Sequence, residues 1–272
     1  MKIKIFEKRT LYKRVFFLVS ILFFTSCSLF NKKSEDKSVW QIYQKNYQPK
    51  REYLDHLTEL GKHYLNTPGV KNIRLRTSSK KYLKGIYRQI VKSNEIYLKE
   101  DKSPEFFIIK DQAPFIFSLP GAKFYISTSL LEKYLKNESL MIAAIGTQVV
   151  KSSLNVYDDR RTVPVGYIGT GKIISLTKVS LKIKNEINKW TFISLKRANF
   201  DATAILNWIQ TKNKNIIDFT YMVGTQKQST EEEFLFKNFL VQDSENVFEE
   251  VSFENSSKGF YNLVRDVRRS LN

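Results

Sequence analysis

The sequence predicts a mainly helical α+β domain with a small β-sheet, and two patterns support this fold class. Several stretches repeat apolar residues at intervals of three and four, which is typical of amphipathic helices. Two short aromatic-rich runs flank Pro120-Gly121, which predicts a β-hairpin. A third observation, a basic and then apolar N-terminus that ends at the single cysteine, sets residues 1–26 apart from the folded part.

The N-terminus has the order of a bacterial signal peptide. Six basic residues precede an apolar run from Val15 to Phe24. This run is about half as long as the roughly 20 apolar residues of a membrane-spanning helix, so we expect cleavage rather than a permanent anchor. Phe24-Thr25-Ser26-Cys27 resembles a lipobox, which implies lipid on Cys27. The alternative is a plain thiol in an uncleaved helix. A lone cysteine can form neither an internal disulfide nor a thiolate metal site.

The domain organisation follows from this signal. We expect a lipoprotein signal peptide over residues 1–26, a lipidated Cys27 with a flexible tether over 27–39, and one domain over 40–272. The segment from Ser28 to Ser38 is polar and short, as a tether would be. The remaining length suits a single domain with a substantial core.

The formal net charge is +18, of which about +13 lies after the signal. The basic residues are scattered, which is usual for a solvated face. On a lipid-tethered protein they would be attracted to anionic headgroups. Export makes nucleic acid an unexpected partner.

The first part of the domain contains the predicted hairpin. Apolar spacing predicts a helix over Tyr53–Tyr64, ended by Pro68-Gly69, and a second over Tyr82–Ile90. Strands are expected over 105–110, 114–118 and 123–127.

The rest of the chain is predicted to be helical. A helical region begins in Ser129–Lys136, and Glu138–Ser153 is the most apolar helix. Val163–Gly171 reads as a loop, because its glycines lack the spacing and lysine of a phosphate loop. Ile173–Ile187 is ambiguous between strand and helix. Further helices are expected over 190–210, 234–240 and 260–271.

The segment from Phe117 to Ser153 carries a family resemblance. Its blocks are Phe117 with Leu119-Pro120-Gly121 at a turn, Leu130-Leu131 at a helix start, and Asn137-Glu138 at the start of the apolar helix. In this order and spacing the segment resembles zinc metallopeptidases of the HtpX and BepA type, peptidase family M forty-eight. The resemblance implies a metallopeptidase-like, gluzincin-type domain, with a small β-hairpin or sheet packed on the helix that would carry the zinc motif.

The same register implies that every catalytic position of the motif is replaced. Thr147 falls at the first zinc-binding His, Gln148 at the general-base Glu and Lys151 at the second His. Peptide hydrolysis at a zinc ion of this kind needs two neutral imidazoles one helical turn apart and a carboxylate that takes a proton from the bound water. These three side chains supply neither.

The resemblance also implies a third ligand position on a later helix. The best candidate segment is Arg197-Ala198-Asn199-Phe200-Asp201, in which Arg197 takes the place of a Glu and Asp201 matches the family's closing Asp. A permanent cation at the ligand position would repel a metal ion.

The histidine count excludes the family's zinc site independently. The chain has only His56 and His63, seven residues apart and therefore about two helical turns. We expect surface or hydrogen-bonded histidines there, with no metal and no cofactor in the protein.

These observations favour a catalytically inactive, metallopeptidase-like envelope lipoprotein. The resemblance implies a binding or scaffolding role in envelope protein quality control. The expected partners are a membrane, through the lipid on Cys27, and another envelope protein; the preferred location is an outer membrane, facing the periplasm. Three alternatives stay open: a domain without cleft function, a basic surface-binding lipoprotein, or an enzyme with a non-zinc site built from Asp158-Asp159 or Glu231–Glu233.

Overall fold

A computed structural model describes residues 49–95, 98, 103–242 and 256–271. The described residues all belong to one compact unit, Gln48–Asn272. The signal peptide, Cys27 and the tether lie outside them. The elements in chain order are α3 (Arg51–Leu65), β1 (Asn72–Ile73), α4 (Thr77–Lys92), β2 (Glu105–Ile109), β3 (Ile116–Leu119), β4 (Lys123–Ser127), the π-helix η1 (Leu130–Tyr134), α5 (Glu138–Ser153), α6 (Thr170–Thr177), α7 (Leu181–Arg197), α8 (Ala204–Lys214), α9 (Gln226–Gln242) and α10 (Lys258–Arg269).

The predicted fold class is confirmed: the domain is α+β and mainly helical, with a small mixed sheet. The strand order is β1-β2-β4-β3. β3 and β4 form the predicted antiparallel hairpin, in which Phe117 lies opposite Tyr125 and the two rings stack. β4 runs parallel to β2. β3 is an edge strand of the sheet, because it pairs with β4 on one side only. The two-residue strand β1 was not predicted.

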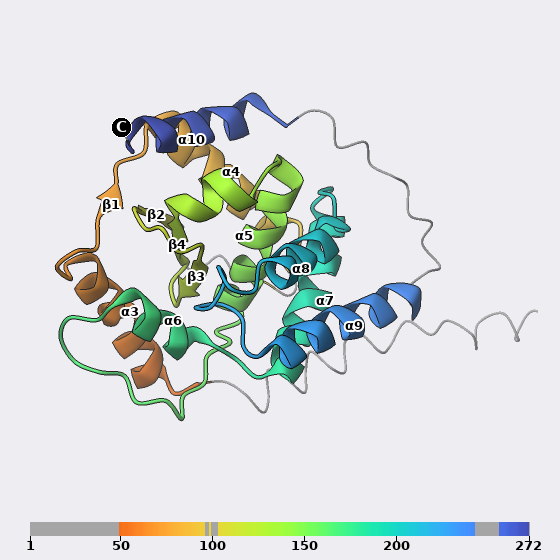
Figure 1. The fold of residues 1–272 in the computed structure, drawn as a ribbon, viewed down its shortest axis with the longest axis horizontal. Coiled ribbons are helices and arrows are strands. Elements are labelled where there is room, and N and C mark those ends of the chain that lie inside the picture. Colours follow the sequence, from red (N-terminus) through yellow and green to blue (C-terminus); the bar gives the residue numbers. More distant parts are fainter. Residues whose placement is uncertain (1–48, 96–97, 99–102, 243–255, 272) are drawn as a thin grey trace, which may run out of the picture. The chain divides into compact units, whose positions relative to one another are not determined.

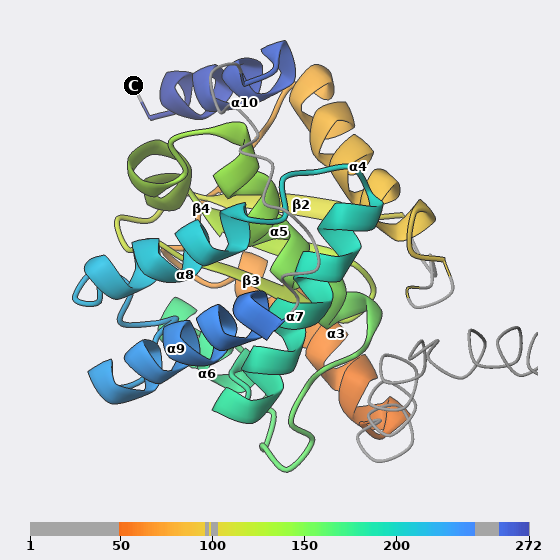
Figure 2. The same cartoon turned by 90° about the vertical axis from the view of Figure 1, so that its right-hand side faces the viewer.

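The sheet is covered on both faces, because successive side chains of a strand point to opposite sides. Phe124 and Ile126 of β4 face a core that also includes residues of α4, α5, α7, α8, α9 and α10. Tyr125, between them, faces a smaller core formed with α3 and α6. Figures 1 and 2 show these two helical layers with the sheet between them.

α5 is the central helix of the larger layer. It begins where the sequence places it, because the Asn137 side chain accepts a hydrogen bond from the Leu140 N–H at 2.8 Å. Glu138 accepts hydrogen bonds from Tyr82 and Ser257, which ties the start of α5 to α4 and α10. Most residues of α5 are buried, as its uniformly apolar sequence predicts.

The prediction of one helix over 190–210 is wrong. α7 stops at Arg197, where Asn199 adopts a positive φ of 56° and the Phe200 N–H donates to Leu195 O at 2.9 Å. This is a left-handed helix termination, which asparagine tolerates without glycine. Asp201 then accepts hydrogen bonds from the backbone and hydroxyl of Thr203, just before α8 begins.

The structure resolves the ambiguous stretch over 173–187 into two helices. α6 ends at Thr177, and α7 begins after Ser180, whose hydroxyl oxygen accepts from the Ile183 N–H. The helix predicted from Phe234 begins earlier, at Gln226. Among the described helices, none is both long and apolar enough to cross a membrane.

Candidate functional site

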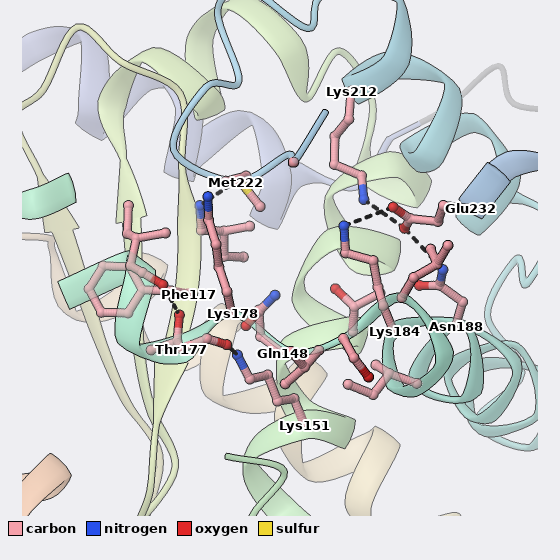
Figure 3. A pocket seen from close by; sticks show the side chains of 18 of the residues that line it. Phe117, Gln148, Lys151, Thr177, Lys178, Lys184, Asn188, Lys212, Met222 and Glu232 are labelled. Carbon is pink, nitrogen blue, oxygen red and sulfur yellow. Dashed lines mark hydrogen bonds and ion pairs between the residues drawn. The ribbon is translucent and has the colours of Figure 1, made fainter. Parts of the chain in front are cut away.

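A cavity of about 200 Å³ lies where β3, α5, α7, α8 and α9 come together (Figure 3). The connection from α6 to α7 closes one side of it. Its walls combine apolar side chains with lysines and amides. The lining residues are Ile116, Phe117, Thr147, Gln148, Lys151, Ile174, Thr177, Lys178, Val179, Ser180, Leu181, Lys184, Ile187, Asn188, Trp208, Lys212, Met222, Gly224, Gln228 and Glu232.

The three residues that the resemblance places at the zinc motif come together in this cavity. Thr147 and Lys151 are four residues apart on α5 and therefore lie one turn apart on the same face. Gln148 lines the cavity beside them, and its Oε1 accepts a hydrogen bond from the Ser118 hydroxyl of β3 at 3.2 Å. The helix that the resemblance singled out thus does border a cavity, next to the edge strand.

Lys151 is an almost fully buried lysine. Its side chain is 7% exposed, its Nζ donates to Thr177 O, and it lies 5.4 Å from the centre of the Tyr157 ring. Burial, assisted by the positive charges of Lys184 and Arg161, lowers the pKa of Lys151 to about 7. The amine is therefore poised between its charged and neutral forms near neutral pH.

The residues at these positions do not fit a zinc ion. The Thr147 hydroxyl donates to Ala144 O at 2.8 Å, Gln148 offers only a neutral amide, and Lys151 brings a positive charge. Zinc is held by imidazole, thiolate or carboxylate. Nowhere in the described part of the chain do three His, Cys, Asp or Glu side chains gather as a metal would require.

Arg197 and Asp201, from the segment that the resemblance gives the third ligand position, do not line the cavity. Arg197 is exposed at the last position of α7. The residues of α7 that line the cavity include Lys184 and Asn188. Nine residues separate Asn188 from Arg197, which is roughly 13 Å along a helix axis. Arg197 thus lies apart from the cavity, and Asn188 is a residue of α7 that lines it.

A buried ion network completes the cavity wall. Glu232 of α9 is 1% exposed and accepts from Lys184 at 2.9 Å and from Lys212 at 3.1 Å. Asn188 donates to the same carboxylate at 3.1 Å. Lys212, on α8, is 6% exposed. One carboxylate of α9 thus serves two lysines and an amide from two other helices, α7 and α8.

The network favours the charged form of Glu232, whereas the balance at Lys212 disfavours the charged amine. Burial alone would raise the pKa of Glu232, but the charges of Lys212 and Lys184 and the hydrogen bonds from Lys184 and Asn188 hold it at about 2. Burial outweighs the single carboxylate at Lys212, whose pKa is lowered. The cations in this wall are therefore only partly neutralised.

The chain matches no model of a known protein family. A search of the curated proteins finds no significant match either.

Sequence reasoning missed the ion network, because scattered charges were expected to be solvated. A run of carboxylates such as Glu231–Glu233 is typical of a solvated loop or helix start, but Glu232 is only 1% exposed. A usable signal was present. Lys212 lies four residues after the buried Trp208, and Glu232 lies four residues before the buried Phe236, so both charges fall on apolar helix stripes.

The other carboxylate pair and the two histidines lie outside the cavity. Asp158 accepts from Arg160 at 2.8 Å and lies 3.4 Å from Arg161, within the loop that precedes α6. His56 and His63 are exposed on α3. The predicted loop over 163–171 leads into α6, which begins at Thr170, and it does not line the cavity.

Proposed function

We propose that this chain is a catalytically inactive, metallopeptidase-like lipoprotein that acts as a binding or scaffolding protein in the quality control of envelope proteins. Lipid on Cys27 would hold it at a membrane, preferably the outer membrane with the domain in the periplasm. The domain would have a gluzincin-type arrangement, with the β3-β4 hairpin against α5.

One observation carries this proposal. Thr147, Gln148 and Lys151, the positions that the resemblance assigns to the zinc motif, line one cavity beside the edge strand β3. A cavity kept at this place, with groups unsuited to zinc, supports binding rather than hydrolysis.

The alternatives gain less support. Asp158 is engaged by two arginines, and Glu232 is enclosed by Lys184, Lys212 and Asn188. Carboxylates held in this way are unsuited to act as a general base. The basic surface-binding hypothesis has no specific contact in its favour.

The first experiment tests the inactive site. Purified protein is expected to carry no stoichiometric zinc and to leave casein intact. Chelator-sensitive cleavage of casein, or one zinc per chain by metal analysis, would contradict the proposal.

The second experiment tests binding in cells. A photoreactive amino acid is placed at Gln228, which lines the cavity, and in a matched strain at Lys182, an exposed residue of α7 that does not line it. We expect one envelope protein to crosslink from position 228 and not from 182. Equal crosslinking from both sites, or none, would count against a partner-binding cavity.

The third experiment tests the anchor. Native protein is expected to incorporate labelled palmitate and to sediment with membranes, whereas Cys27→Ser does neither. Palmitate incorporation that survives this substitution would refute the anchor.

A further inference from the structure

The cavity has an excess of positive charge. Four lysines line it: Lys151 from α5, Lys178 from the connection between α6 and α7, Lys184 from α7 and Lys212 from α8. Among the lining residues only Glu232 is acidic. Glu232 is already shared by Lys184 and Lys212. The other two amines therefore have no share in that carboxylate.

Among the described residues, the hydrogen-bond acceptors of the Lys151 and Lys178 amines are backbone carbonyls. Lys151 Nζ donates to Thr177 O, and Lys178 Nζ lies 3.5 Å from Val223 O. Within the described ranges, neither amine lies within 4.0 Å of a carboxylate oxygen. A backbone carbonyl accepts a hydrogen bond from the amine but brings no negative charge to it.

Neutral donors and an apolar wall surround these amines. Gln148 points into the same space (Figure 3), and since its Oε1 already accepts from Ser118, its NH₂ group remains as a donor. Ile174, Leu181 and Met222 form an apolar part of the lining. The volume, about 200 Å³, is below the range of about 300–1,000 Å³ typical of drug-sized ligands, so the cavity suits one small group.

We propose that this cavity binds a carboxylate on a short aliphatic stem, with Lys151, Lys178 and the Gln148 amide as its donors. The carboxylate could belong to a free organic acid or to an acidic side chain of a bound polypeptide. Binding of an acidic side chain rests on the proposed function, whereas binding of a free organic acid does not. Where the resemblance implies a site for a dication, the charges of this chain make a site for an anion.

Lys151 gives the proposal a specific signature. The groups that face it are Lys184 from α7, Arg161 and the Tyr157 ring from the loop after α5, and Thr177 O at the end of α6. Both charged neighbours are cations, and together with burial they lower the pKa of Lys151. An arriving carboxylate favours the charged amine, so binding above neutral pH takes up a proton.

The experiment is calorimetric titration of the full purified protein at pH 8 and low salt. The probes are glutarate and its neutral analogue glutaramide. We expect saturable binding of glutarate only, weakened at least tenfold in Lys178→Gln and in Lys151→Gln, but unchanged in the control Lys182→Gln. Repeating the titration in buffers of different ionisation enthalpy should show proton uptake, which is lost in Lys151→Gln.

A second arm uses a capped pentapeptide with one central Glu and its Gln counterpart. Binding of the Glu peptide supports an acidic side chain as the source. Binding of glutarate without the peptide supports the carboxylate site with a free acid as its ligand, and counts against the partner-binding function. The carboxylate proposal is overturned if glutarate does not bind, if Lys178→Gln binds it as well as native protein, or if inorganic phosphate binds more tightly than glutarate.

Discussion

Replacing Lys151 with methionine tests the central electrostatic feature of the cavity. Below pH 7 the amine is protonated in both the folded and the unfolded protein. Between about pH 7 and its ordinary pKa of 10.5, only the unfolded protein holds the proton. Because the unfolded state then binds more protons, the free energy of unfolding rises with pH in this window.

The size of this rise follows from the lowered pKa. Each pH unit well inside the window adds about 1.4 kcal/mol, and because Lys151 is half-protonated near pH 7, the rise from pH 7 to pH 9 is about 2 kcal/mol. Lys151→Met lacks this contribution, since methionine does not titrate. The other lysines of the cavity remain in both proteins, so the difference between the two pH profiles isolates Lys151.

The assay is urea denaturation at pH 7 and pH 9, followed by tryptophan fluorescence. From pH 7 to pH 9, the free energy of unfolding of native protein should rise by about 2 kcal/mol more than that of Lys151→Met. The exposed Lys182→Met is the control, and its profile should parallel that of native protein. If the profile of Lys151→Met also parallels that of native protein, Lys151 titrates normally and the argument from burial fails.

Three further predictions concern packing, charge and metal. Glu232→Gln leaves Lys212 and Lys184 without a carboxylate and should lower the free energy of unfolding by about 3–5 kcal/mol in urea denaturation at pH 7. In native protein the contribution of Glu232 should be lost as the pH falls from about 4.5 to about 2, because its folded pKa is the lower one. Gly61→Ala should lower the free energy of unfolding by about 1–3 kcal/mol, because a Cβ there would lie 2.5 Å from Tyr125 Oη. Gly85→Ala, in open space on α4, should raise it by up to about 1 kcal/mol. A variant that combines Thr147→His, Gln148→Glu and Lys151→His with Asn188→Glu should bind zinc in calorimetric titration. The same triple variant with Arg197→Glu in place of Asn188→Glu should not bind it. The reverse result would contradict the placement of α7.

Local patterns in the sequence determined most of the elements. Three local patterns each predicted what the structure contains, because they depend on neighbours in the chain: the Pro120-Gly121 turn, the aromatic-rich run of 123–127 and the apolar run of 138–153. The exceptions include the strand β1, the start of α9 and the end of α7. The end of α7 depends on Asn199 in a left-handed conformation, which a helical pattern does not reveal.

The sequence by itself also determined that Thr147, Gln148 and Lys151 share a region of one helix and cannot hold zinc, since side-chain chemistry and helical spacing decide both. Only the tertiary structure decided what surrounds them. Lys178, Lys184, Lys212 and Glu232 come from segments far apart in the chain, and it is helix packing that buries one carboxylate among them. Burial and charge balance depend on such non-local contacts, and these give the cavity four lysines and a single carboxylate.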